Sequence, residues 1–400
     1  MDKIKIVDAR MGRGKTSAAI EYMQSNSSNK RFLYITPYLT EVERICDACD
    51  FEQPDSDHLT KLSELKKLMH QKKNVASTHS LFSLLDEDAL DLIRSNHYSL
   101  IIDEGIDVVS NVNVTSKDRE LILTQLSQVS KDGKVKWIDE DYSGKFSGYK
   151  EMADADSLYM LDSALIYVMK PEMLESFDSV TMMTYLFNGQ YQKAYLDFYG
   201  IDYEVVGVNS GDVFTFSDKP DDPPPLNYKE LIHIVDDERM NEVGNRDYSL
   251  SKNWYRTKGY NHPDIRTLRN NMHNFFRSPN ITADKRLWTC FKSDSDKLVN
   301  KSNGRYRSSF LQMTARATNE YRSRTHVAYM INRFLDPNIV KFFGQRGAFL
   351  DADKFALSEM LQFIWRSAIR DNNHIELYIP SKRMRMLLTD WIEINSKGGC

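Results

Sequence analysis

The sequence predicts an α/β protein made of two tandem domains, each built on a mainly parallel sheet. Short apolar runs alternate with amphipathic helical stretches in both halves of the chain, which is the pattern of β/α units. A glycine-bearing loop joins the first apolar run to a helix. Near the middle of the chain, a stretch rich in proline and aspartate interrupts the pattern and predicts a linker.

The first β/α unit carries a phosphate-binding motif. Ile4 to Val7 alternates with lysine and predicts a strand, and apolar residues at helical spacing follow the loop. Strand, glycine-bearing loop and helix in this order are the context of a P-loop, which predicts ATP and Mg²⁺ as cofactors. Lys15 would reach the β- and γ-phosphates, and the Thr16 hydroxyl would ligate Mg²⁺. Ala9 stands where the first glycine of the motif is usual. The residues expected to surround the nucleotide are Met11, Gly12, Arg13, Gly14, Lys15, Thr16 and Ser17.

A second motif of the same domain lies four β/α steps further on. Residues 98–102 form an apolar run that predicts a buried strand, and the adjacent carboxylates Asp103 and Glu104 end it. In P-loop ATPases, the strand-end aspartate holds Mg²⁺ and the following glutamate polarises the attacking water. The pair is a weak signal alone, but it is specific when it follows a P-loop at this distance.

The domain boundaries follow from composition. Residues 1–216 form the expected first domain, in which the polar stretch 111–176 is an insertion with a hairpin or a mobile segment near 131–150. Residues 217–228 hold the proline-rich linker. Residues 229–400 form the second domain, whose helix over 354–370 would place Gln362, Arg366 and Arg370 on one face.

The net charge of −4 conceals a division between the halves of the chain. From residue 251 onward there are 26 Lys and Arg against 13 Asp and Glu, a net of +13, whereas the first 250 residues carry 27 against 44, a net of −17. A basic half predicts contact with a polyanion, although a solvated basic face is the alternative. Aromatic residues lie among the basic ones and are candidates for stacking on bases: Trp254, Tyr255, Tyr260, Tyr306 and Tyr321.

Overall composition indicates a globular protein of a reducing compartment. Hydrophobic residues make up 41% and charged residues 28% of the chain. No apolar run is long enough to span a membrane, and the N-terminus lacks the apolar core of a signal peptide, so we expect a cytoplasmic protein with no membrane partner. The four cysteines include Cys46 and Cys49, which lack a second pair at zinc spacing.

Together these motifs resemble, over nearly the whole chain, a superfamily 2 helicase, and more narrowly the small helicase-like ATPases of bacteriophages. The resemblance implies two RecA-like domains with a nucleotide cleft between them, and a location in the cytoplasm of a bacterial host. It also implies that Gln362 and Arg366 of the second domain face the triphosphate held by the first. Arg370 is four residues from Arg366, whereas the family spacing is three.

The resemblance also implies residues that contact a nucleic-acid strand. Thr184 falls where the family's coupling motif is expected. Only seven residues precede the P-loop segment in this sequence, so we do not expect the upstream adenine-sensing glutamine of DEAD-box helicases, and the base preference stays open. The strand-contacting residues by this resemblance are Thr36, Pro37, Thr78, His79, Arg316, Thr318 and Asn319.

We therefore expect an ATP-dependent helicase or translocase on single-stranded or branched nucleic acid, DNA rather than RNA, in phage replication or recombination and with replication proteins as partners. One alternative is a nucleotide-gated clamp or loader that hydrolyses ATP without unwinding. A phage packaging terminase is a further alternative. It would need a C-terminal nuclease with clustered aspartates, whereas the acids of residues 251–400 are scattered.

Overall fold

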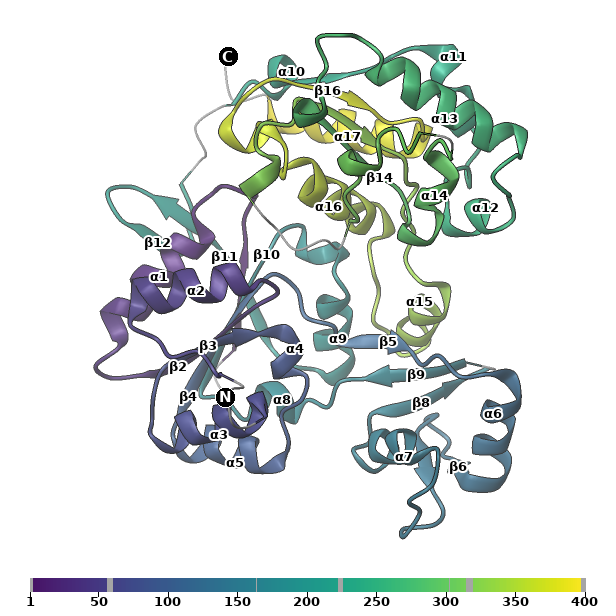
Figure 1. Cartoon of the computed structure of the whole chain (residues 1–400). Coiled ribbons are helices and arrows are strands. Elements are labelled where there is room, and N and C mark those ends of the chain that lie inside the picture. Colours follow the sequence, from purple (N-terminus) through teal and green to yellow (C-terminus); the bar gives the residue numbers. More distant parts are fainter. Residues whose placement is uncertain are drawn as a thin grey trace. The chain divides into compact units, whose positions relative to one another are not determined.

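The computed structural model describes residues 3–55, 60–162, 164–221, 226–301, 303–313 and 319–396. The chain divides into two compact units (Figure 1). Unit 1 consists of residues 1–10, 14–220 and 335–351, and unit 2 of residues 11–13, 221–334 and 352–400. The change of unit after Pro220 falls inside the linker expected from composition. Residues 335–351, which the sequence analysis placed in the second domain, instead belong to unit 1.

Unit 1 is organised around a seven-stranded sheet in the order β12-β11-β1-β10-β4-β2-β3. The strands are parallel except β12, which pairs antiparallel with β11. In a parallel sheet with helices on both faces, successive side chains enter two different cores. The strands are β1 (Ile4–Asp8), β2 (Arg31–Thr36), β3 (Val75–Thr78), β4 (Tyr98–Asp103), β10 (Ser179–Thr184), β11 (Tyr203–Ser210) and β12 (Phe214–Ser217).

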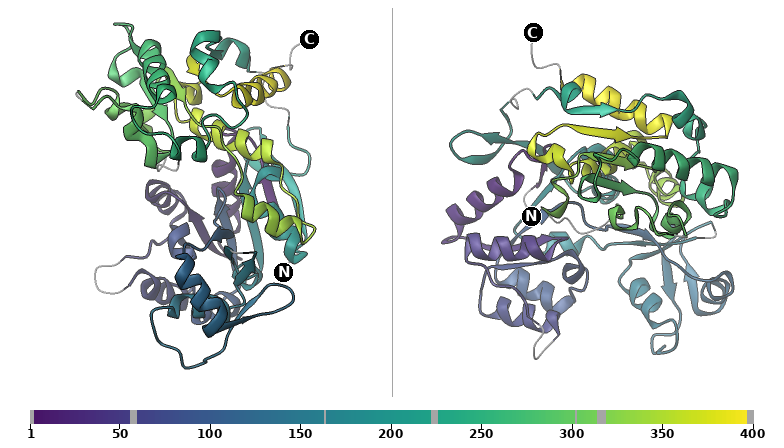
Figure 2. Two further views of the ribbon diagram at one scale, coloured as in Figure 1. Left: turned by 90° about the vertical axis from the view of Figure 1, so that its right-hand side faces the viewer. Right: turned by 45° about the horizontal axis from the view of Figure 1, so that its top comes forward.

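The alternation is visible along β2 and explains why each face is covered by its own helices. Phe32 and Tyr34 pack in one core cluster with α1 and α2, whereas Leu33 and Ile35 join the other with α3, α5 and α9. Two views of the ribbon show helices on either side of the sheet (Figure 2). The helices of this unit outside the insertion are α1 (Lys15–Asn26), α2 (Leu39–Cys49), α3 (Lys61–His70), α4 (His79–Phe82), α5 (Glu87–Ser95), α8 (Glu172–Glu175), η2 (Phe187–Gly189), α9 (Tyr191–Tyr199) and α15 (Pro337–Gly344).

The polar insertion between β4 and β10 is a small folded body. It holds a three-stranded antiparallel sheet in the order β5-β9-β8. Strands β6 and β7 form a hairpin that overlaps only the start of the stretch 131–150, where a hairpin or a mobile segment was expected. Val135, Ala153, Leu158 and Leu165 form its own apolar cluster. Its elements are β5 (Val109–Asn111), α6 (Ser116–Leu121), η1 (Ile122–Leu126), β6 (Ser127–Val129), β7 (Val135–Trp137), α7 (Ser147–Asp154), β8 (Leu158–Leu161) and β9 (Ala164–Val168).

Unit 2 is a smaller α/β unit on a parallel sheet in the order β13-β16-β15-β14. One face packs on α12 through Tyr255 and on α13 through Ile265, Leu268 and Met272. Its strands are β13 (Ile232–Ile234), β14 (Arg286–Thr289), β15 (His326–Tyr329) and β16 (Ile375–Tyr378). Its helices are α10 (Tyr228–Leu231), α11 (Glu238–Asn241), η3 (Glu242–Gly244), α12 (Lys252–Arg256), α13 (Pro263–Phe276), η4 (Ala283–Lys285), η5 (Lys292–Asp294), α14 (Ser295–Leu298), η6 (Arg307–Ser309), η7 (Asn319–Tyr321), α16 (Ala352–Ile364), η8 (Ala368–Asp371) and α17 (Lys382–Asn395).

The long helix expected over 354–370 is shorter in the structure, which corrects one expectation. Helix α16 ends at Ile364, and η8 begins only at Ala368. Ser367 separates them because its backbone is extended (φ −87°, ψ −170°) and its hydroxyl donates to the Ile364 carbonyl. Gln362, Arg366 and Arg370 therefore do not share one helical face.

Candidate nucleotide-binding site

The loop between β1 and α1 has the backbone that a phosphate cradle requires. Gly12 and Gly14 adopt left-handed conformations (φ 77° and 78°), which residues with a Cβ seldom adopt. Gly14 is the N-cap of α1 and has no side chain that could cap the first turn. The N–H groups of that turn and the positive end of the helix dipole therefore make an anion-binding site here.

Gly14 is required for a second reason, which is its neighbour on β12. A Cβ at Gly14 would overlap the ring of Phe214, so the ring packs directly on the loop backbone. At Gly12 an added Cβ would meet nothing within 4 Å. The hairpin of β11 and β12 thus supports the P-loop from outside, although nothing in the sequence marked Phe214 as part of this site.

Lys15 is held close to the loop and near three carboxylates. Its ammonium group donates to the carbonyl oxygens of Ala9 (2.5 Å) and Arg10 (3.2 Å). Burial lowers the pKa of Lys15, and the charges of Asp103 and Glu104, followed by that of Asp8, oppose the shift. The Lys15 side chain therefore lies beside the acidic end of β4, where the two sequence motifs meet.

The acidic end of β4 contains a strained residue. Glu104 has φ 63°, a left-handed conformation that costs free energy in any residue other than glycine. Such a conformation persists only where its surroundings fix it. The Tyr38 hydroxyl donates to Glu104 Oε2 (3.1 Å), and His79 Nε2 lies 2.9 Å from the carbonyl oxygen of Asp103. We call residues 104–106 the acidic turn.

The titration of the two groups beside the turn follows from burial. Burial raises the pKa of the Asp103 carboxyl, and the Tyr34 hydroxyl and the Lys15 ammonium oppose that shift. Burial also lowers the pKa of His79 to about 4, against the effect of its bond to Asp103. His79 is therefore neutral at neutral pH. Because the partner is a carbonyl oxygen, Nε2 carries the proton.

Asp8 ties the loop to the end of β10, and sequence reasoning did not assign it a role. Its carboxylate accepts hydrogen bonds from the backbone N–H groups of Leu186 (2.8 Å) and Phe187 (3.1 Å). Leu186 is itself left-handed, with φ 57°. The P-loop strand is thereby bonded to the segment that follows Thr184. A strand-end aspartate was the only local signal, and it does not predict such a distant partner.

These residues fit ATP and Mg²⁺. In the parallel part of the sheet, β1 and β4 flank β10, so the P-loop and the acidic turn follow strand ends at the same carboxyl edge. The Lys15 side chain, the Asp103 carboxyl group and the loop amides are the donor set that a metal-bound triphosphate needs. Thr16 and Asp103 are the residues that would hold the metal.

The residues expected to contact a nucleic-acid strand differ in their exposure and partners, and some of them lie outside the described residues. Thr36 is fully buried with 0% exposure, so its side chain is not available to a phosphate at the surface. The Thr78 hydroxyl accepts from the Leu81 N–H as the cap of α4, and His79 bonds to Asp103 as above. Pro37 is half-buried. Arg316 and Thr318 lie outside the described residues, as does the side chain of Asn319.

The second-domain residues lie within unit 2 as follows. Arg366 is 9% exposed, and its guanidinium donates to the carbonyl oxygen of Met313 (2.8 Å). Gln362 is half-buried on α16, and Arg370 is exposed on η8. Burial and a protein carbonyl partner make Arg366 part of the packing of unit 2, whereas Arg370 is open to solvent.

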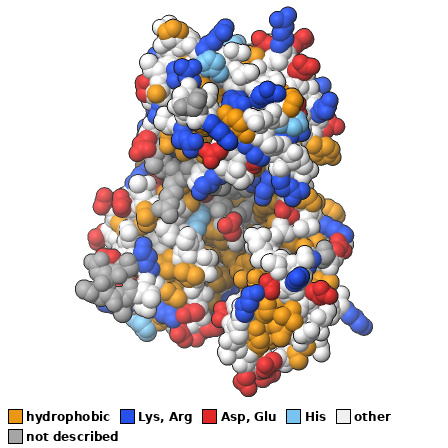
Figure 3. All heavy atoms as spheres, turned by 45° about the vertical axis from the view of Figure 1, so that its right-hand side comes forward, with side chains coloured by type: hydrophobic (Ala, Val, Ile, Leu, Met, Phe, Trp, Pro, Cys, Tyr) orange, Lys and Arg blue, Asp and Glu red, His pale blue; other side chains and the backbone are white. Residues whose placement is uncertain are grey.

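The aromatic residues that were expected to stack on bases include buried tyrosines and a tyrosine whose ring already contacts cations. Tyr255 is fully buried and donates to the Met330 carbonyl, so it is a core residue. Tyr306 is also buried. The Tyr260 ring carries the Arg269 guanidinium at 3.9 Å and the Lys301 ammonium at 4.5 Å from its centroid, and these cations compete with any base for its faces. Figure 3 shows Lys and Arg side chains spread over the face of this unit.

In the part of the chain that the structure describes, no helix is long and apolar enough to cross a membrane. No group of three or more His, Cys, Asp or Glu side chains is placed there to hold a metal ion.

Comparison with known proteins places the chain in a family. It is 36% identical, over 98% of its length and 99% of the relative's, to the SPbeta prophage-derived protein YonV of Bacillus subtilis (strain 168). The chain belongs to the YonV family. The YonV middle domain matches residues 109–168, which is the inserted body, and the YonV C-terminal Rossmann-like domain matches residues 226–392.

A solved structure supports the fold. The chain is similar to XPD in its apo form, with a TM-score of 0.50 and 13% identity over 99% of this chain and 96% of that one. XPD is a superfamily 2 helicase with two tandem RecA-like domains. The expected fold class, an α/β protein with two RecA-like domains, is confirmed. At this identity the likeness concerns fold alone.

Proposed function

We propose that this YonV family member is an ATP-dependent nucleic-acid translocase or helicase. The observation that carries the proposal is the meeting of Lys15, Asp103 and the strained Glu104 at the carboxyl edge of the unit 1 sheet. Residues of this kind in a parallel α/β unit perform nucleoside triphosphate hydrolysis. The likeness in fold to XPD favours a motor on nucleic acid over other uses of that chemistry.

Each of the candidate site residues in unit 1 has a role in this proposal. On binding, the triphosphate takes the Lys15 ammonium away from the Ala9 and Arg10 carbonyls, and the loop amides surround its oxygens. Thr16 and Asp103 would hold a magnesium ion, which would supply charge neutralisation of the phosphates. The Glu104 carboxylate orients the attacking water and accepts its proton.

Unit 2 contributes the second cation of the proposed reaction. Arg366 would exchange its Met313 carbonyl partner for a phosphate oxygen, and Gln362 lies one turn earlier on α16. Arginine suits this role because it stays charged and offers several donors in a planar fork. The basic half of the chain supplies the sequence-independent attraction to the phosphates of a strand.

We propose DNA as the polymer and a phage replication or recombination process as the context. The prophage origin of the 36% identical relative supports the context. The test is strand displacement on tailed DNA and RNA duplexes, with ATP, without ATP, and with the Lys15→Ala variant. We expect the unaltered chain to separate the DNA duplex only when ATP is present, and we expect the Lys15→Ala variant not to separate it. Hydrolysis stimulated by a strand without separation or movement would favour the clamp.

A further inference from the structure

A segment of the C-terminal half is built into the core of unit 1. The chain leaves unit 2 after Phe334, forms α15, and re-enters unit 2 at Ala352; we call residues 335–351 the returning segment. Phe342 and Phe343 on α15 are fully buried in the unit 1 core. In Figure 1, α15 lies beside α9 and β5, and both elements contact it. The segment is therefore part of unit 1 by packing and part of the second half by connectivity.

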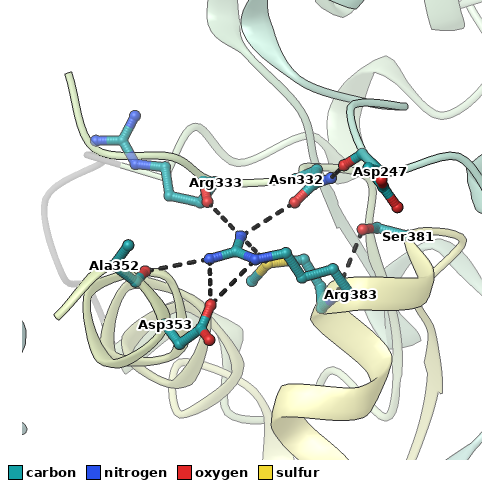
Figure 4. Close-up of polar contacts among 8 residues, drawn as sticks. Asp247, Asn332, Arg333, Ala352, Asp353, Ser381 and Arg383 are labelled. Carbon is teal, nitrogen blue, oxygen red and sulfur yellow. Dashed lines mark hydrogen bonds and ion pairs between the residues drawn. The ribbon is translucent and has the colours of Figure 1, made fainter. Parts of the chain in front are cut away.

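The residues that flank the returning segment on either side are held within unit 2 by one side chain. Arg383 of α17 donates to Asn332 Oδ1 (3.2 Å) and to the Arg333 carbonyl (2.8 Å), just before the segment leaves. The same guanidinium donates to the Ala352 carbonyl (3.2 Å) and to Asp353 Oδ1 (2.7 Å), where the chain returns (Figure 4). The residues on both sides of the segment are thus anchored in the body of unit 2.

In unit 1, the returning segment bonds to the stretch that follows β10. The backbone N–H of Asp336 donates to the Tyr191 hydroxyl (3.0 Å), and that of Asp351 donates to the Asn188 carbonyl (3.3 Å). Asn188 belongs to η2 and Tyr191 begins α9. The first and last parts of the segment therefore meet the same stretch, residues 187–192.

That stretch also holds the acidic turn. Gln192, 8% exposed on α9, donates through Nε2 to the Ile106 carbonyl (2.5 Å). A Cβ at Gly105 would lie 2.6 Å from Gln192 Nε2, so the amide rests directly on the turn. Phe187 and Gln192 also line a small pocket with Glu104. Two adjacent residues thus connect the two segments: Tyr191 bonds to the returning segment, and Gln192 bonds to the acidic turn.

We propose that Gln192 is a positioning residue for Glu104, and that the returning segment acts on the acidic turn through Tyr191 and Gln192. The inference rests on the proposed ATPase function of that site. Glu104 is held in a strained backbone conformation, so its carboxylate position depends on the bonds on either side of it. A displacement of the returning segment by unit 2 shifts the start of α9, and Gln192 passes that shift to the turn.

The first test compares Gln192→Met, which keeps the length of the side chain but loses the amide, with Asn96→Ala. Asn96 is the matched control because it is a buried amide that also donates to backbone carbonyls, next to the opposite end of β4. We expect kcat for ATP to fall about tenfold or more in Gln192→Met, with KM and nucleotide affinity unchanged. Asn96→Ala leaves kcat unchanged. An unchanged kcat in Gln192→Met would overturn the proposal.

Gly105 offers an independent variant. In Gly105→Ala the new methyl group displaces the Gln192 amide, so kcat should fall as it does in Gln192→Met. The two changes should be non-additive, because the second removes a contact that the first has already broken. Fully additive losses would mean that Gln192 and the turn act separately, which contradicts the assignment.

The role of the returning segment is tested with Tyr191→Phe, which loses only the hydroxyl that accepts the Asp336 N–H. Tyr98→Phe is its control, since Tyr98 is a buried tyrosine whose hydroxyl donates to the Lys73 carbonyl far from the turn. We expect Tyr191→Phe to lower the strand-stimulated kcat several-fold and to speed hydrogen exchange in residues 103–107. Tyr98→Phe should change neither. No change in either measurement for Tyr191→Phe overturns this step.

Failure of the inference and failure of the proposed function give different results. If the unaltered chain does not hydrolyse ATP, the proposed function fails. If it hydrolyses ATP and the Gln192 and Tyr191 variants match it in kcat and in hydrogen exchange, only the inference fails.

Discussion

At the scale of single residues, the site depends on a few side chains whose charge state is set by burial. Burial lowers the pKa of Lys15 while the charges of Asp103 and Glu104 oppose that shift, and burial keeps His79 neutral at neutral pH. Lys15, Asp103 and Glu104 were predictable because each stands at a fixed position in a local motif. The hydrogen bond between His79 and Asp103 was not predictable, because the two residues lie on different β/α units.

The His79 pKa predicts a pH dependence of stability. The folded chain holds His79 neutral down to about pH 4, whereas the unfolded chain protonates it near 6.5. Between these values the unfolded state binds more protons, so the free energy of unfolding falls as the pH is lowered from 6.5 towards 4. The slope is at most about 1.4 kcal/mol per pH unit. Denaturant unfolding of the unaltered chain and of His79→Asn over this pH range measures this dependence. The free energy of unfolding of the variant should lack this part of the slope. Equal slopes for the two proteins would contradict the assignment of the slope to His79.

At the scale of elements, the P-loop is shaped by its own glycines and by β12, an edge strand of the sheet. The strand–loop–helix order predicted the loop, since that signal is contiguous in sequence. The support from Phe214 on β12 joins residues 200 positions apart and left no local pattern.

This support predicts different costs for alanine at the two glycines. Both have positive φ and pay the same backbone penalty, but only Gly14→Ala also meets the Phe214 ring. Thermal unfolding without nucleotide should therefore show a larger loss of Tm for Gly14→Ala than for Gly12→Ala. In a Phe214→Ala background the difference should largely vanish. Equal losses in the unaltered background would mean that the ring does not constrain the loop.

The end of α16 separates the two arginines of the last motif, and this bears on their roles. The helical spacing in the sequence suggested one basic face, but the extended Ser367 breaks the helix between them. We expect Arg366→Ala to leave ATP binding largely intact and to lower turnover by on the order of 10³-fold. Arg366→Lys should rescue poorly, and Arg370→Ala should do less harm.

Nucleotide titration and steady-state turnover of the three variants check these expectations. A fall in nucleic-acid affinity alone, with saturated turnover unchanged in Arg366→Ala, would assign this arginine to the strand instead.

At the scale of the whole molecule, the sequence predicted two α/β units and the linker between them. It did not predict that residues 335–351 return to unit 1, because Phe342 and Phe343 are as apolar as residues of any core. Pattern shows that a segment is buried, but not which unit buries it. The same applies to Gln192, whose partner lies 86 positions away.

The charge division predicts how the chain meets a strand. With a net of +13 from residue 251 onward, binding of single-stranded nucleic acid should release counterions. Affinity should therefore fall steeply between about 50 and 200 mM salt. Fluorescence anisotropy with a labelled oligonucleotide measures it. Affinity that did not change over this range would show that the basic residues serve another surface.

The most direct test of the proposed function is steady-state ATP hydrolysis by the unaltered chain and by Glu104→Gln, each with and without single-stranded DNA. Glu104→Gln keeps the shape of the side chain but cannot accept a proton. We predict that the strand stimulates hydrolysis by the unaltered chain, and that Glu104→Gln binds ATP with similar affinity but does not turn it over. Turnover by Glu104→Gln at the rate of the unaltered chain would contradict the assignment of the acidic turn as the catalytic site.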